Sequence, residues 1–165
     1  MKLNLQEKNE LLFQPSSPYY CGSSCLLSLY VIIQAIRDSS NKDLSKELID
    51  LQGNILSLFD EDTALFDLSK KQDFLMEEEW KQVLDALDEY AMIISSLTQL
   101  EDVCFSTDKK RYLSHLHHAK LFLIELAKMN LSIFEVRDDK PYAFGRISND
   151  VFAAIKKGNQ YEIGF

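Results

Sequence analysis

Apolar residues recur every three or four positions through most of the chain, which is the period of an amphipathic helix. The run SSCLLSLYVIIQAIR at residues 23–37 is apolar on nearly all sides and predicts a buried central helix. Its β-branched residues leave a strand over residues 29–33 as the alternative, although the length of the run favours the helix. A second helix is predicted over residues 44–59, followed by an irregular stretch over residues 60–73.

Two longer helices are predicted in the middle of the chain. The first spans residues 76–100 and carries Glu78, Asp85 and Glu89 on its polar side. Its apolar stripe consists of Trp80, Val83, Leu84, Leu87, Ala91 and Ile94. The second spans residues 108–129, directly after hydroxyl-bearing residues that can cap it.

The pattern changes near the C-terminus. The run LSIFEVRDDKPYAFGRI at residues 131–147 alternates with period two around a DDKP turn, which predicts a β-hairpin. Ser148 is expected to cap a short helix over residues 149–157 that Gly158 ends. Residues 161–165 can return as a third strand. The predicted fold is therefore mainly α in an α+β arrangement, a bundle of four to five helices with a small C-terminal antiparallel β-hairpin or three-stranded element.

Composition agrees with one helix-rich domain over residues 1–165. Apolar residues make up 46% of the chain, enough for a hydrophobic core, and only five glycines and three prolines interrupt it. Three cysteines cannot pair completely, and the first 15 residues are polar without an apolar signal segment. No apolar run reaches the roughly 18 residues of a membrane-spanning helix. These features predict a cytoplasmic protein, and the lack of a phosphate-binding glycine loop predicts no cofactor.

The charge of the chain narrows the class of partner. Eighteen basic and 26 acidic residues give a net charge of −8, which argues against nucleic acid or a membrane surface as a direct partner. Residues 60–102 hold thirteen acidic residues and three lysines, a net charge of −10. This concentration favours a basic protein partner, since it attracts positive charge over a long range. The alternative is an ordinary solvated helix face, on which three consecutive glutamates complement the helix N-terminus.

The candidate residues for such a partner lie in that acidic segment. They are Glu78, Asp85 and Glu89 on the exposed helix face, with Asp60, Glu61 and Asp62 beside them. A small, acidic, helix-rich chain of this kind is similar in profile to the immunity proteins of bacterial toxin–immunity pairs. Those proteins cover the active site of a toxin, often a basic nuclease. The resemblance implies a non-enzymatic inhibitor whose carboxylates mimic phosphates and pair with lysine and arginine in the toxin.

A cysteine-containing segment, FQPSSPYYCGSSCLLSLYVII, supports a different function. A cysteine at the start of a buried helix can have a lowered pKa, and a glutamine upstream can donate to an oxyanion. The segment resembles the nucleophile region of papain-like peptidases, and more closely the branch that processes double-glycine leaders. The resemblance implies a cysteine hydrolase with Cys21 as nucleophile and Gln14 as oxyanion donor. His118 would be its histidine, and Asp138 or the adjacent Asp139 would orient that histidine. Otherwise Cys21 and Cys25 are small buried apolar residues.

Three further features carry weaker hypotheses. The run SHLHHAK places His115 and His118 on one helix face, but zinc needs three or four ligands, so no metal site is predicted. Residues 137–140 are expected to form a charged hairpin tip, either solvated or inserted into a partner's cleft. The apolar surplus at residues 26–36 could serve a homodimer, which leaves an oligomeric helical regulatory or structural protein as a third possible function.

Overall fold

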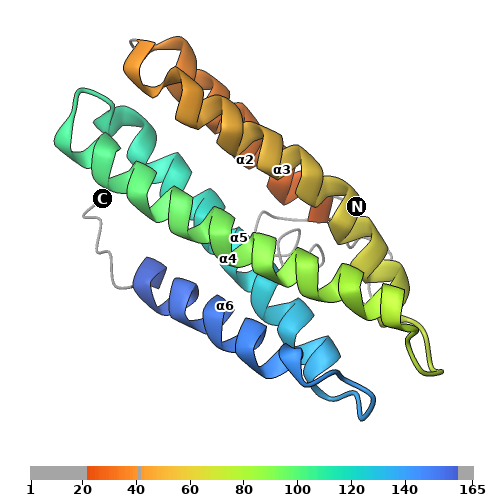
Figure 1. Cartoon of the computed structure of the whole chain (residues 1–165). Helices are drawn as coiled ribbons and strands as arrows, with labels where there is room; N and C mark the ends of the chain where they lie inside the picture. Colours follow the sequence, from red (N-terminus) through yellow and green to blue (C-terminus); the bar gives the residue numbers. More distant parts are fainter. Residues whose placement is uncertain (1–21, 41, 160–165) are drawn as a thin grey trace, which may run out of the picture.

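A computed structural model describes residues 22–40 and 42–159, and this part of the chain contains helices and no strands. The order of elements is α2 (Gly22–Asp38), α3 (Lys42–Ser69), α4 (Glu77–Ser106), a 3-10 turn η1 (Lys110–Tyr112), α5 (Leu113–Glu135) and α6 (Ala143–Asn159). The long helices lie roughly side by side as an elongated bundle (Figure 1). The helical prediction for residues 29–33 is confirmed, because α2 runs through them.

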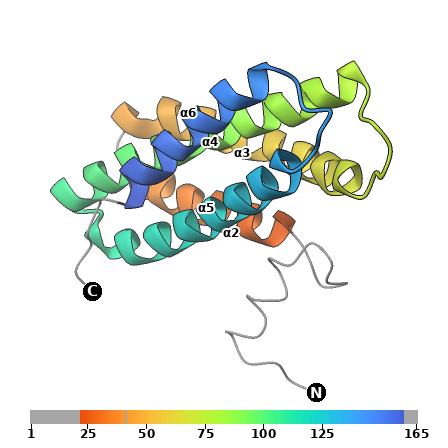
Figure 2. The same ribbon diagram turned by 90° about the horizontal axis from the view of Figure 1, so that it is seen from below.

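Helix α4 is the central element of the bundle. It packs against α3, α5 and α6, whereas α2 packs against α3 and α5. Figure 1 shows α4 between α3 and α6, and Figure 2 shows α5 with α2 on another side of the bundle. Tyr90 and Leu87 of α4 are fully buried, together with Phe134 of α5. The described helices share this hydrophobic core.

The predicted β-hairpin is wrong. Residues 131–135 complete α5, residues 136–142 connect two helices, and residues 143–147 begin α6. The run also satisfies a helical period, because Leu131 and Phe134 are buried three positions apart, and so are Phe144 and Ile147. The DDKP turn is real, but it joins helices rather than strands. The third strand predicted at residues 161–165 lies outside the described residues.

Helix boundaries also differ from the predicted ones. The stretch predicted as irregular at residues 60–73 is helical as far as Ser69, because Leu65 and Leu68 continue the buried face of α3. Ser148 does not cap a helix but lies buried inside α6. Gly158 does not end α6 either, because the helix includes it and runs to Asn159, and Gly158 is buried there. Both errors arose because polar or small residues were treated as boundaries although tertiary contacts bury them.

The two loops at one end of the bundle are tied together by Asp139. Its Oδ2 accepts hydrogen bonds from the Leu75 N–H at 2.7 Å and from Trp80 Nε1 at 3.3 Å. Arg137 donates from Nε to Asp139 Oδ1 at 3.2 Å and from Nη1 to the Lys71 carbonyl at 2.8 Å. Burial alone would raise the pKa of Asp139, but these hydrogen bonds and the Arg137 guanidinium hold it below its ordinary value. Residues 137–140 were predicted as a charged hairpin tip. Two of them, Arg137 and Asp139, instead hold the two loops together through these hydrogen bonds.

Replacing Asp139 with alanine is expected to lower the thermal midpoint and shift the fluorescence of Trp80 to longer wavelength. The substitution removes the acceptor of the Trp80 N–H and the anchor of the Leu75 amide, so water reaches the indole. Because Trp80 is the only tryptophan, its emission reports on this site alone. Asp138→Ala is the matched control, since Asp138 is the exposed neighbour in the same loop. Equal emission and equal midpoints for the two variants would contradict the clamp.

Candidate protein-binding surface

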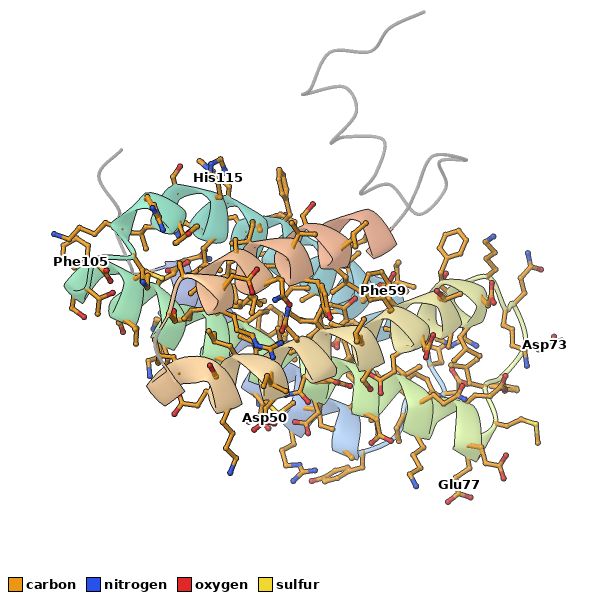
Figure 3. All side chains as sticks on the ribbon, turned by 90° about the horizontal axis from the view of Figure 1, so that it is seen from above. Asp50, Phe59, Asp73, Glu77, Phe105 and His115 are labelled. Carbon is orange, nitrogen blue, oxygen red and sulfur yellow. The ribbon has the colours of Figure 1, made fainter. Side chains whose placement is uncertain are left out.

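The outer side of α4 carries three of the six predicted partner residues, Glu78, Asp85 and Glu89. Burial of Trp80, Val83, Leu87 and Tyr90 fixes which side of α4 faces the core. The opposite side carries five acidic residues, which we call the acidic strip, and one exposed lysine, Lys81, lies among them. The strip consists of Glu77, Glu78, Asp85, Asp88 and Glu89. All of its members are exposed except Glu89, which is half-buried. Figure 3 shows Glu77 near Asp73, at the end of the bundle opposite Phe105.

Carboxyl groups from α3 and α4 converge beside this strip. We call Asp60 and Glu61 of α3, with Asp85 and Glu89 of α4, the acidic seam. Burial, a hydrogen bond with Glu89 and the charges of Glu89, Asp85 and Asp60 raise the pKa of Glu61 to about 8. The buried Glu61 Oε2 accepts no hydrogen bond from a described N–H or O–H group, and the neutral form of this carboxyl group is the one that burial favours. The seam therefore brings four carboxyl groups close to one another.

Described ion pairs do not neutralise these groups. Within residues 22–40 and 42–159, no salt bridge joins a member of the strip or the seam to a lysine or arginine. Glu79, between strip positions, is paired with Lys71 Nζ at 2.6 Å, and this hydrogen bond lowers its pKa. The crowded carboxylates are therefore available to cations from another molecule.

Asp62 differs from its acidic neighbours because it belongs to the core. Its side chain is buried and accepts a hydrogen bond from the Tyr90 hydroxyl at 2.7 Å. Asn130 Nδ2 donates to the same hydroxyl at 3.2 Å and to the Leu126 carbonyl at 3.2 Å. This network joins α3, α4 and α5 in the interior. Asp62, predicted as a partner residue, does not lie on the surface with Asp60 and Glu61.

A groove between α4 and the start of α6 lies on the other side of the strip. Its volume is about 850 Å³, and its apolar lining comes from both helices and both clamped loops: Leu75, Trp80, Leu84, Pro141, Ala143 and Ile147. Its charged lining consists of Glu77, Glu78, Lys81, Asp85 and Arg146. Glu78 and Asp85 thus lie on its rim. The sequence did not predict the groove, because its α6 wall falls in the segment predicted as a hairpin.

A buried charged cluster joins α4, α5 and α6 elsewhere in the fold. Lys120 Nζ lies 2.8 Å from Glu101 Oε2 and 3.0 Å from the Gly158 carbonyl, and both side chains are fully buried. His117 Nδ1 lies 3.1 Å from Glu101 Oε1. His115 and His118 point outward on α5. In the part of the chain that the structure describes, no three His, Cys, Asp or Glu side chains are grouped to hold a metal.

The structure does not bring His118 together with Asp138 or Asp139, the residues of the hydrolase hypothesis that it describes. Cys21 and Gln14 lie outside the described residues, as does the side chain of Cys25. His118 lies near the start of α5, whereas Asp138 follows its end, and the helix between them spans about 25 Å. Burial and the charge of Glu101, opposed by Lys109, raise the pKa of the Cys104 thiol to about 11. Cys104 is accordingly an inert core residue.

Comparison with known proteins identifies no relative: no protein-family model, curated protein or solved structure matches this chain. None of the described helices combines the length and the apolar character needed to cross a membrane.

Proposed function

We propose that this protein binds a basic protein partner through the acidic strip of α4 and the acidic seam between α3 and α4. The observation that carries the proposal is the seam itself, where burial and the neighbouring carboxyl groups of two helices together raise the pKa of Glu61 to about 8. A lysine or arginine supplied by a partner would relieve this repulsion. No described cation does so within the chain. The described residues offer surface charge without a catalytic constellation beside it, which favours a binding role.

The finer form of the proposal is an immunity-type inhibitor that covers the active site of a basic toxin. Its support is the similarity of profile and the arrangement of Glu78 and Asp85 on one exposed helix face. Carboxylates spaced along a helix can occupy the positions that nucleic-acid phosphates would take in a nuclease cleft. The basic-partner proposal does not depend on this finer form, because any protein with a positive surface meets the same charge requirement.

Binding to a basic peptide is expected to weaken by at least tenfold between 50 and 300 mM NaCl. The probe is a fluorescein-labelled decalysine peptide, and its anisotropy is followed during titration with the full chain. Several ion pairs form at an exposed surface, so salt screens their attraction. The variant Asp85→Asn/Glu89→Gln removes the two acidic groups that belong to both the strip and the seam, and it is expected to weaken binding at least several-fold at 50 mM NaCl.

The matched control is Asp102→Asn/Asp108→Asn, which removes two exposed charges at the other end of the bundle. It keeps the same net charge as the test variant, so a general loss of charge would affect both equally. Equal weakening by the two variants would contradict a defined surface, and binding that is insensitive to salt would contradict the electrostatic proposal.

A further inference from the structure

The groove and the seam flank the same acidic strip, and Asp85 belongs to both. Asp85 lines the groove, and its charge is one of those that raise the pKa of Glu61 in the seam. Glu78 lies on the groove rim two helical turns before Asp85. A partner segment that lies across α4 would therefore contact the apolar groove on the α6 side and the carboxyl groups of the seam on the α3 side.

The groove has a fixed shape for this role. Trp80 and Ile147, on its floor, are almost completely buried, at 5% and 7% exposure. Its wall at Pro141 and Ala143 follows directly after Asp139, which is hydrogen-bonded to Leu75 and Trp80 on the facing side. A site whose walls are held before binding spends less free energy on ordering itself.

We propose that the groove takes a bulky apolar side chain of the basic partner, while a lysine or arginine three or four positions away in that partner reaches Asp85 and the seam. The inference rests on the proposed function and adds the chemistry of the bound segment: an amphipathic segment with apolar and basic residues at helical spacing. The apolar side chain anchors the complex, and the cation fixes its orientation and speeds its formation.

Charge distinguishes this groove from one between α5 and α6. The groove between α5 and α6 has a volume of about 620 Å³ and is lined by Lys128, Glu135 and Phe152 among others. None of its lining residues belongs to the acidic strip or seam. Its charged lining is one lysine and one glutamate, whereas the α4–α6 groove carries Glu77, Glu78 and Asp85 against Lys81 and Arg146 and opens beside the acidic seam.

Three synthetic 14-residue peptides without tryptophan test the inference. One carries lysine and leucine at helical spacing, the second replaces leucine by serine, and the third replaces lysine by glutamate. The lysine–leucine peptide is expected to bind the full chain at least tenfold more tightly than the lysine–serine peptide. It is also expected to shift the emission of Trp80, the only tryptophan, to shorter wavelength. The glutamate–leucine peptide is expected not to bind.

The substitution Ala143→Phe fills the groove with a phenyl ring and is expected to remove the tenfold advantage of leucine while leaving lysine–serine binding unchanged. Ala153→Phe makes the same change further along α6, outside this groove, and serves as the control. Equal affinity for the two lysine peptides would overturn the inference and leave the proposed function standing. Binding of neither lysine peptide at low salt would overturn both, and tight binding of the glutamate–leucine peptide would overturn the role of charge.

Discussion

Replacing Lys120 with methionine is expected to destabilise the protein by about 3–5 kcal/mol, which is the usual cost of leaving a partner charge buried and uncompensated. The Lys120 ammonium is fully buried and contacts Glu101 Oε2 at 2.8 Å and the Gly158 carbonyl at 3.0 Å. Without the ammonium group, Glu101 loses the hydrogen bond to its Oε2 and keeps the contact of its Oε1 with His117. The Gly158 carbonyl loses the hydrogen bond that Lys120 donates. Urea unfolding followed by far-ultraviolet circular dichroism at pH 7 measures the change.

Lys128→Met is the matched control on the same helix. Lys128 pairs with Glu125 at 3.3 Å, but both side chains are largely accessible, at 44% and 58% exposure. Exposed pairs contribute little, so the control is expected to change stability by less than about 1 kcal/mol. The double variant Lys120→Met/Glu101→Leu is expected to recover most of the loss, because it removes both charges together. A double variant as unstable as Lys120→Met would show that lost packing, and not the stranded carboxylate, causes the effect.

This ion pair illustrates why part of the fold escaped prediction. A lysine and a glutamate in a helical pattern are normally assigned to the surface, because burial of either alone is costly. Lys120 and Glu101 are buried because each is the other's partner, although they lie 19 residues apart in the chain and on different helices. The same holds for Asp62, whose partner Tyr90 lies 28 residues away. Pairing between distant residues is not visible in local periodicity.

The spacing of apolar residues predicted a helix and its buried side correctly where the apolar positions of the pattern are the ones that the fold buries. The stripe of α4 from Trp80 to Ile94 was predicted, and with it the exposure of Glu78 and Asp85 on the other side. It failed at residues 131–147, where apolar residues fit both a period of two and a period of three to four. The acidic strip could therefore be read from the sequence. The groove beside it could not, since it needs α6 and the Asp139 clamp in place.

Buried polar contacts also tie neighbouring helices together along the bundle. Gln52 of α3 donates to the Tyr30 carbonyl of α2 at 3.3 Å, Tyr90 joins α4 to α3, and Lys120 joins α5 to α4 and α6. Apolar stripes alone tolerate sliding of one helix along another, whereas a buried donor must meet its acceptor. These contacts set the register of the helices, and that register brings Glu61 opposite Glu89 and opens the groove beside Asp85.

The stability of the protein is expected to decrease as pH rises from about 5 to 9, and Glu61→Gln is expected to reduce this decrease. In the folded state the pKa of Glu61 is raised from 4.5 to about 8 by burial and by neighbouring carboxyl groups. The unfolded chain therefore loses this proton at lower pH than the folded chain does, which favours unfolding. The stability contributed by the protonated group is fully present below pH 4.5 and is lost as pH rises through about 8.

Glutamine keeps the shape of Glu61 and a hydrogen bond to Glu89 but cannot ionise. Glu61→Gln is accordingly expected to be as stable as the wild type near pH 5 and clearly more stable at pH 9, as measured by urea unfolding across the range. Glu78→Gln is the control, because Glu78 is exposed on the same strip and lies outside the seam. The carboxyl groups with lowered pKa values, Asp139 and Glu79, lose their contributions only in acid and are common to all three proteins. Parallel pH profiles for Glu61→Gln and the wild type would mean that folding does not raise the pKa of Glu61, which would remove the observation on which the proposed binding surface rests.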